Sequence, residues 1–237
     1  MNAWAPGATD ERALRDEMVR VARRTYEAGL VAATDGNLSH RLGTDRLLIT
    51  RSGVCLGELT TDDIVRVTLS GEPLPGEAHR PSSEYRMHVV VYEARADVHA
   101  VLHAHPPITL GFSIAGESLA GCVLPEVVVG LGTIPTLDYT TPTTEATAAL
   151  VGEMIPSRDA LILDRHGTVT VADTITHAFH KLDKVEHTAK ITLHAKQLGK
   201  VRTLPPQEVQ KLLGMREKMG LPPLIPNCNN CGICITK

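Results

Sequence analysis

A strand that ends in histidines is the feature of this sequence from which the fold and the site can be worked out. Residues 97–110 read DVHAVLHAHPPITL. Side chains of a strand point alternately to its two faces. The small and aliphatic residues at even positions 98–104 are therefore expected on one face, and His103 and His105 on the other. Two imidazoles at the end of one strand face are thus predicted to point to a common position, just before a double proline ends the strand.

A third histidine is delivered in the same way. Residues 160–167 read ALILDRHG, an apolar strand that leads into His166 and a glycine. Catalytic zinc sites typically use three protein ligands and leave a position open for substrate or water. We therefore expect His103, His105 and His166 to bind Zn²⁺, and the same donors accept Co²⁺ or Mn²⁺.

An acidic residue, Glu84, lies in the stretch PSSEYRMH. Residues 84–94 are expected to form a helix with Ser82 or Ser83 as its N-cap. His88 lies on the same helix face as Glu84, where it could orient the carboxylate. Because a carboxylate near a metal centre can transfer a proton, Glu84 is the candidate catalytic acid or base.

Three short polar loops are candidates for an anion site. They read TDGNLS, ITRSG and PSSE, and they offer glycines or hydroxyls beside free backbone N–H groups, which can bind a phosphate. The candidate phosphate-binding residues are Gly36, Asn37, Ser52, Gly53, Ser82 and Ser83. Together the loops are expected to hold one phosphate group of a substrate.

Length, charge and hydropathy exclude several classes of protein. A chain of 237 residues suits one large domain. The net charge of -3, without a cluster of Lys or Arg, argues against a nucleic-acid partner. The first twenty residues contain no apolar region of signal-peptide length, and no stretch approaches the roughly 18 apolar residues of a membrane span. We expect a cytoplasmic protein without a membrane or nucleic-acid partner.

Helices and strands are mixed along the whole chain. Helices are expected at residues 11–30, 84–94, 143–154, 173–199 and 206–219, with strands around residues 34–53, 97–105 and 159–172. Such a mixture around one sheet is typical of an α/β or α+β domain. A catalytic domain is expected over residues 1–215 and a Cys-rich tail over residues 216–237.

The tail carries three cysteines at C-x₂-C-x₂-C spacing. They are Cys228, Cys231 and Cys234. This spacing resembles three quarters of a metal or cluster motif, but a fourth ligand is missing. The tail is therefore a candidate second metal or redox site, with subunit sharing, a disulfide and free thiols as the alternatives.

The order of these motifs resembles the class II aldolase/adducin family. In this chain they run T-x-G-N-L-S, I-T-x-S-G, P-S-S-E-x-x-x-H, H-A-H and H-G, and the resemblance covers roughly residues 12–200. It implies a single three-layer α/β/α domain on a mostly antiparallel central sheet, assembled as a homotetramer with active sites at subunit contacts. It also implies the zinc, proton-transfer and phosphate-binding roles given above.

The resemblance further implies an aldolase that acts on a small phosphorylated sugar. Its substrate would be a ketose 1-phosphate of the fuculose, ribulose or 5-deoxypentulose type, cleaved to dihydroxyacetone phosphate and an aldehyde. Three neutral histidines leave the charge of a metal nearly whole, so the metal can stabilise the enediolate that cleavage leaves. Tyr139 matches a family tyrosine that acts on the aldehyde-side oxygen. The C-terminal tyrosine of the family is missing, because no tyrosine follows Tyr139.

Four other functions stay open from the sequence. A pentulose-5-phosphate 4-epimerase uses the same chemistry, but the family's epimerases carry an aspartate at the position of Glu84. A methylthioribulose-1-phosphate dehydratase and a decarboxylase of a hydroxylated acid would use the same metal site. A non-catalytic adducin-like interaction module would be signalled by loss of the metal histidines or the acid, and all four residues are present.

Overall fold

The structure is a computed structural model that describes residues 10–221, and its centre is a seven-stranded sheet in the order β3-β2-β1-β4-β7-β6-β5. All neighbouring strands pair antiparallel except β5 and β6, which pair parallel. The strands are β1 Asn37–Leu42, β2 Arg46–Thr50, β3 Ile64–Thr68, β4 Ala100–Ala104, β5 Thr136–Leu137, β6 Ala160–Leu163 and β7 Gly167–Ala172. The expected mostly antiparallel central sheet is confirmed.

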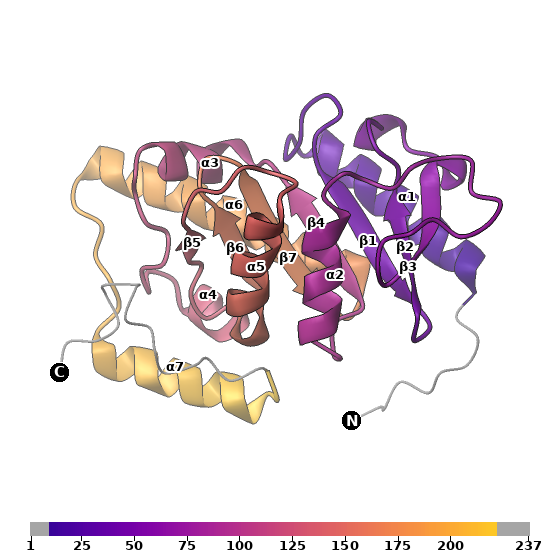
Figure 1. Ribbon diagram of the computed structural model, residues 1–237. Helices are drawn as coiled ribbons and strands as arrows, with labels where there is room; N and C mark the ends of the chain where they lie inside the picture. Colours follow the sequence, from indigo (N-terminus) through magenta and orange to yellow (C-terminus); the bar gives the residue numbers. More distant parts are fainter. Residues whose placement is uncertain (1–9, 222–237) are drawn as a thin grey trace.

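Helices cover both faces of this sheet (Figure 1). The α-helices are α1 Glu11–Glu27, α2 Tyr85–Ala94, α3 Pro107–Ile114, α4 Pro125–Gly130, α5 Glu145–Met154, α6 Ile175–Leu198 and α7 Pro206–Lys218, and the short 3₁₀ helices are Leu56–Glu58, Thr61–Asp63 and Ile155–Ser157. One core lies between the sheet and α1 and α6, and a second lies between the sheet and α2 and α5. These are the three α/β/α layers that the sequence predicted.

Strand β4 contributes to both cores through alternate residues. Leu102 and Ala104 pack with α1 and α6, whereas Val101 packs with α2 and α5. His103 shares the face of Val101 and is fully buried. The expectation that Val98 belongs with Leu102 was wrong: the strand begins at Ala100, and Val98 packs in the core of α2 and α5.

The long helix α6 begins and ends where its sequence indicates. Thr174 caps it, since the threonine side chain accepts a hydrogen bond from the backbone N–H of His177. Gly199 ends it with a positive φ of 153°, a conformation that favours glycine. Helix α6 packs against strands β4 and β7.

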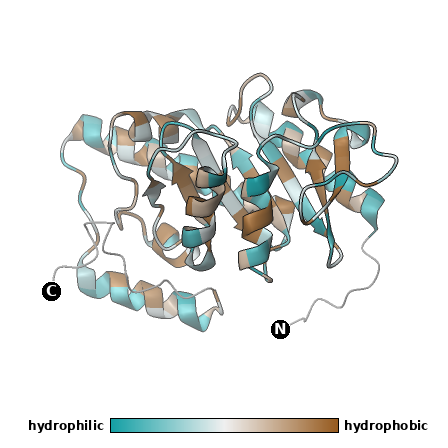
Figure 2. Ribbon diagram, viewed as in Figure 1, coloured by the Kyte–Doolittle hydropathy of each residue, from teal (hydrophilic) through white to brown (hydrophobic). Residues whose placement is uncertain are grey.

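Helix α7 packs against α4 through a small apolar cluster that includes Val128 and Val209. In Figure 2 its hydrophobic residues form brown bands among hydrophilic ones, as expected for a helix with one buried face. The expected division at residue 215 falls inside this helix, whose Arg216 is buried.

The three cysteines of the tail lie outside the described residues. Among the helices of the described part, none has the length and apolar content needed to span a membrane.

Candidate metal centre and active site

The three histidines predicted from the sequence meet at one end of the sheet. His103 is on β4, His105 lies one residue beyond it, and His166 is in the turn between β6 and β7. Antiparallel pairing of β4 with β7 brings that turn beside the end of β4. The ligand atoms of the three side chains all lie within 4.8 Å of one another.

Gly167 permits this close approach. A Cβ atom at this position would lie 2.6 Å from the carbonyl oxygen of Ala104 and 2.8 Å from Cε1 of His103. Such contacts are shorter than van der Waals packing allows, so any side chain here would push the turn away from β4. The glycine of the H-G motif therefore sets the distance between His166 and the other two histidines.

The donor atoms suit a divalent cation. Nδ1 of His103 lies 2.9 Å from the carbonyl oxygen of Thr168 and donates to it, so Nε2 is the ring nitrogen that faces the cluster, where it offers a lone pair whenever it carries no proton. That lone pair faces Nε2 of His105 at 3.0 Å. Nδ1 of His105 lies 3.5 Å from Asp35 Oδ2, which favours the proton on the far side of that ring too. Lone pairs that face one another need a cation between them, so the three histidines can hold a metal ion.

Glu84 completes this cluster. Its Oε2 lies 3.1 Å from Nε2 of His103, and its Oε1 lies 3.1 Å from Nε2 of His166. Burial alone would raise the pKa of the Glu84 carboxyl, but the positive charge of His103 and His166 when their Nε2 atoms are protonated, and the hydrogen bonds that these atoms then donate, outweigh burial and lower it. Glu84 is therefore ionised in the site. Burial, with the charges of His103 and His166, lowers the pKa of His105 to about 4, which keeps its ring neutral.

The expected capping of helix α2 by a serine was wrong. The helix begins at Tyr85, and Glu84 itself occupies the N-cap position. Ser82 Oγ accepts a 3.3 Å hydrogen bond from the backbone N–H of Glu84, one residue ahead of the helix. The Glu84 side chain makes no capping hydrogen bond and lies instead beside His103 and His166.

Asn37 connects the first polar loop to Glu84. Its Nδ2 donates a 2.9 Å hydrogen bond to Glu84 Oε2, and its Oδ1 lies 2.5 Å from Nε2 of the fully buried His88. The sequence singled out Asn37 for phosphate binding and His88 for a role in orienting Glu84. It did not indicate that these two residues contact each other, since 51 positions separate them in the chain.

The three candidate phosphate loops lie side by side. An isolated antiparallel bridge pairs Arg51 with Pro81, and the backbone N–H of Ser82 donates to the carbonyl of Thr50 at 2.9 Å. Gly36 has a φ of 76°, and a Cβ there would lie 2.6 Å from Val31, so the tight turn before β1 requires glycine. The exposed hydroxyls of the candidate serines belong to Ser52 and Ser83. Phosphate binding by these loops stays a prediction.

Tyr139 contacts Arg165, the residue directly before the third histidine. Its side chain is 52% exposed, and the guanidinium carbon of Arg165 lies 4.8 Å from the centre of its ring. Arg165 directly precedes His166 and has a φ of 54°, which is uncommon for a residue with a side chain. The turn that carries His166 therefore also holds Tyr139 at the surface, and the catalytic role of this tyrosine stays a prediction.

Two partners of the histidines were not found from the sequence. Asp35 stands in the loop TDGNLS, in which the sequence points to the glycine and the asparagine as candidate phosphate-binding residues. Thr168 acts through its backbone carbonyl, which no sequence pattern reports. Histidines that bind metals usually donate their second N–H to a carboxylate or a backbone carbonyl. This rule could have indicated Asp35 as a partner of one of the histidines.

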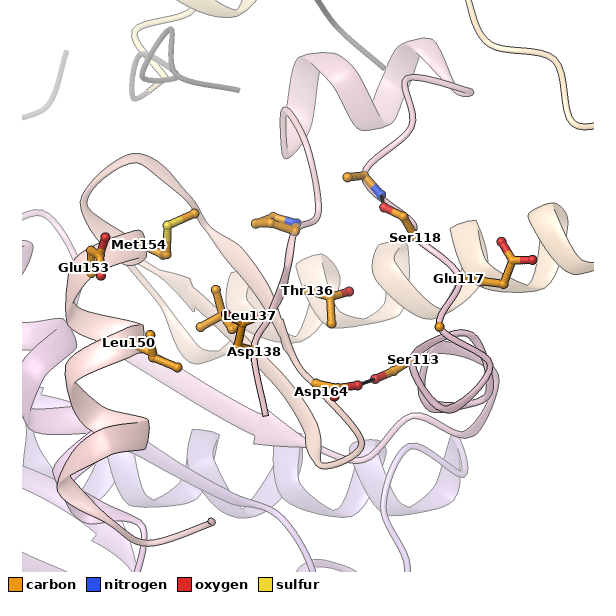
Figure 3. Close-up of a pocket in the computed structure, with 13 residues that line it drawn as sticks. Ser113, Glu117, Ser118, Thr136, Leu137, Asp138, Leu150, Glu153, Met154 and Asp164 are labelled. Atoms are coloured by element: carbon orange, nitrogen blue, oxygen red, sulfur yellow. Dashed lines mark hydrogen bonds between the residues drawn. The ribbon is translucent and has the colours of Figure 1, made fainter. Parts of the chain in front are cut away.

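A pocket of about 420 Å³ opens at the β5 edge of the sheet (Figure 3). It lies between α3, β5 and α5, and Ser113 donates a 2.8 Å hydrogen bond to Asp164 in its wall. Of the described candidate residues, none lines this pocket. It is therefore a separate feature from the histidine cluster.

Fold and site together define the class of protein. This is a three-layer α/β/α domain in which histidines from neighbouring strands and one carboxylate converge at the end of the sheet. The sequence profile of the class II aldolase and adducin N-terminal domain matches residues 16–193. The chain therefore belongs to the class II aldolase and adducin family, as the order of its motifs indicated.

Known proteins similar to this chain include aldolases and decarboxylases. The 3-oxo-tetronate 4-phosphate decarboxylase of Escherichia coli O6:H1 is 30% identical over 185 residues, 76% of this chain and 86% of that protein. The 5-deoxy-D-ribulose 1-phosphate aldolase of Bacillus thuringiensis serovar kurstaki is 30% identical over 207 residues, 87% of this chain and 96% of that protein. A solved L-fuculose 1-phosphate aldolase superimposes with a TM-score of 0.79 at 28% identity, over 88% of this chain and 97% of that one. The chain is a lyase.

Proposed function

We propose that the chain is a zinc-dependent aldolase that cleaves a ketose 1-phosphate into dihydroxyacetone phosphate and a small aldehyde. The observation that carries this proposal is the meeting of three histidine donors within 4.8 Å, with a carboxylate 3.1 Å from two of them. The similarity to aldolases supports it, since 96% and 97% of the chains of two aldolases are covered.

The metal ligands in this proposal are His103, His105 and His166. A divalent cation held by them would supply positive charge that stabilises the oxygen anions generated when a carbon–carbon bond breaks. The three polar loops, which carry Asn37, Ser52 and Ser83 among their residues, hold the C1 phosphate of the substrate and so fix its carbon chain relative to Glu84. The amide Nδ2 of Asn37 has a second hydrogen besides the one given to Glu84, which suits it to a substrate oxygen.

Glu84 and Tyr139 move the protons. In the condensation direction, ionised Glu84 accepts the proton from C3 of dihydroxyacetone phosphate, and Tyr139 gives its hydroxyl proton to the aldehyde oxygen as the C3–C4 bond forms. In cleavage, one proton first passes through water from the Tyr139 hydroxyl to Glu84. The Tyr139 phenolate then takes the proton of the C4 hydroxyl, the C3–C4 electron pair stays with C3, and Glu84 gives its proton to C3, which restores the neutral tyrosine and the ionised carboxylate. Each proton removed in one direction is restored in the other.

The assembly and the tail belong to the same proposal. By resemblance to its family the protein is a homotetramer whose active sites lie at subunit contacts, which sedimentation or mass photometry tests directly. In the C-terminal tail that follows the described residues, Cys228, Cys231 and Cys234 bind a second metal or undergo oxidation. Metal content of a variant with these three cysteines replaced by serine tests the second site, because the histidine site retains its own metal.

Decarboxylation is the second candidate reaction. It is favoured by the similarity to several 3-oxo-tetronate 4-phosphate decarboxylases, of which the first is 30% identical. Loss of CO₂ from a phosphorylated 3-oxo acid also leaves a negative charge, which a divalent cation held by the three histidines would stabilise. The two reactions differ in the product released, so one assay distinguishes them.

The test is product release by the zinc-loaded protein from two sets of substrates. A panel of ketose 1-phosphates is assayed for dihydroxyacetone phosphate, and 3-oxo-tetronate 4-phosphate is assayed for CO₂, each with Glu84→Gln as the control. The proposal expects dihydroxyacetone phosphate release that Glu84→Gln lowers by about 10²- to 10⁴-fold. Release of CO₂ alone would establish the decarboxylase instead, and wild-type turnover by Glu84→Gln would remove Glu84 from proton transfer.

A further inference from the structure

Behind the active site lies a chain of buried polar residues that the mechanism above does not use. His88 and Ser39 are fully buried, and Tyr92 is 3% exposed. Nε2 of His88 lies 2.5 Å from Asn37 Oδ1, Nδ1 of His88 lies 2.7 Å from Ser39 Oγ, and Ser39 Oγ lies 2.8 Å from the Tyr92 hydroxyl. Polar groups are buried at a cost unless they are hydrogen-bonded. The chain leads to Glu84, to which Asn37 donates.

Only one placement of the protons satisfies the first part of this chain. The ionised carboxylate of Glu84 accepts and cannot donate, so the amide of Asn37 must turn its Nδ2 to Glu84 and its Oδ1 to His88. Because Oδ1 is an acceptor, Nε2 of His88 must carry the ring proton. The proton position of His88 is therefore coupled to the orientation of Asn37.

The same logic continues into the core. With its proton on Nε2, His88 offers a lone pair at Nδ1, so the hydroxyl of Ser39 donates there. Ser39 Oγ then accepts from the hydroxyl of Tyr92, which is closer to it than to the carbonyl oxygen of His99 at 3.4 Å. The hydrogen bonds run in one direction, from Tyr92 through Ser39, His88 and Asn37 to Glu84.

Such a chain requires a neutral imidazole, and the surroundings provide for one. Burial and, to a smaller extent, positive charge on His103 lower the pKa of His88 to about 3, against the opposing charge of Glu84. His88 is on helix α2, four residues after Glu84, whereas Asn37 and Ser39 are on β1. The ring therefore joins the helix that carries the carboxylate to the strand that faces it.

We propose that His88 is a positioning residue that holds the Asn37 amide in one orientation and thereby fixes the Glu84 carboxylate between His103 and His166. The kinetic consequence rests on the proposed function of Glu84, whereas the structural consequence does not. Without the ring N–H, the amide of Asn37 is free to rotate and present its oxygen to the carboxylate, which repels it. A carboxylate displaced by as little as 1 Å transfers protons poorly.

The kinetic test compares three variants. His88→Leu removes both ring contacts, while His88→Gln retains an N–H at the position of Nε2 for Asn37. His40→Leu is the matched control, because His40 is a buried histidine on the opposite face of β1, bonded to the carbonyl oxygen of Arg41. We expect His88→Leu to lower kcat by about 10- to 100-fold with KM unchanged, His88→Gln to recover most of the loss, and His40→Leu to retain wild-type kcat. An equal loss in His88→Leu and His88→Gln, or no loss, would overturn the proposal.

Two measurements test the proposal without an activity assay. In crystal structures, His88→Leu should separate Asn37 Nδ2 from Glu84 Oε2, which His88→Gln should keep within hydrogen-bond distance. In the wild-type protein, ¹⁵N spectra of labelled histidines should place the His88 proton on Nε2 from pH 5 to pH 8. A proton on Nδ1, or an Asn37–Glu84 contact unchanged in His88→Leu, would refute the positioning role. If both results hold and the wild type cleaves none of the sugar phosphates, the proposed reaction fails and the positioning role stands.

Discussion

Two buried polar clusters occupy opposite ends of the same strands. At one end, Glu84 meets His103 of β4 and His166 of the β6–β7 turn. At the other end, Asp159 stands directly before β6 and meets Arg95, which ends helix α2 ahead of β4. Both clusters put titratable groups in the interior, so burial alone does not tell a functional site from a structural one.

The partners of the buried groups make the difference. Asp159 lies 3.1 Å from an Arg95 nitrogen, 2.9 Å from Lys181 Nζ and 3.9 Å from a nitrogen of the buried Arg216, so its carboxylate faces three cations. Arg95 also donates hydrogen bonds to the backbone carbonyls of Ile155 and Arg158. Around His103, by contrast, acceptors face acceptors. A cluster in which opposite charges match holds elements together, whereas one in which lone pairs converge is suited to a ligand.

The largest effect on stability is expected at the ionic cluster. Asp159→Asn removes the charge that Arg95 and Lys181 share, and leaving buried cations without their partner lowers the free energy of unfolding by about 3–5 kcal/mol. Denaturant unfolding measures it. Asp97→Asn is the matched control, because Asp97 bonds the same arginine but is 61% exposed, and at most about 1 kcal/mol is expected. Equal effects of the two variants would show that burial of Asp159 is not what matters.

The histidine cluster should respond in the opposite way. His166→Ala removes one of three converging donors and should weaken zinc binding by at least about 100-fold, the upper end of the loss seen for groups that only support a ligand. The unfolding free energy of the metal-free protein should change little. Chelator competition measures the affinity, with the exposed His177→Ala as the control. A stability loss as large as that of Asp159→Asn would break the distinction between the two ends.

Mild acid should destabilise the histidine end first. The pKa of His88 is about 3 in the folded protein, lowered by burial, against about 6.5 in an unfolded chain. Between these values the unfolded chain binds a proton that the folded protein does not, so stability falls as the pH falls. Between pH 8 and pH 5 the loss is about 2 kcal/mol.

The variant His88→Gln isolates this contribution. It should remove that part of the pH dependence of unfolding. If wild type and His88→Gln lose the same stability from pH 8 to pH 5, then His88 is not a buried neutral histidine. The ionic cluster should contribute only in stronger acid, since Arg95 holds the pKa of Asp97 below its usual value.

The histidine end could be predicted from the sequence because local rules report it. Alternation along a strand puts His103 and His105 together, and a glycine after His166 permits close approach of a second strand. The family resemblance then located Glu84, whose distance to the histidines agrees with that expectation. The antiparallel sheet and three layers followed from the same resemblance.

The ionic end could not be predicted, because its contacts join residues far apart in the chain. Arg95 and Asp159 are separated by 64 positions and Asp159 and Lys181 by 22. No periodic pattern relates such positions before the sheet order is known. The same reason hid the contact of Asn37 with His88, and main-chain partners such as the carbonyl of Thr168 have no side-chain signature at all.

The smallest expected effect concerns a residue that belongs to neither cluster. Glu186 of α6 accepts hydrogen bonds from the backbone N–H groups of Ile108 and Thr109, each at 2.8 Å, and so caps helix α3 just beyond His105. Glu186→Gln removes the charge at the helix N-terminus and should cost about 1 kcal/mol of stability, measured by denaturant unfolding.

The same variant tests whether capping of helix α3 and metal binding by His105 are independent. Zinc affinity of Glu186→Gln should stay near that of Glu117→Gln, the control at an exposed glutamate paired with Lys196. The reason is that the bond of His103 to Thr168 and the contact of His105 with Asp35 hold the rings from the other side. A loss of zinc affinity above tenfold would show instead that the cap of α3 positions His105. One residue would then support both the stability of the fold and metal binding. The two clusters differ in this respect, since the ionic cluster is expected to affect stability alone and the histidine cluster metal binding alone.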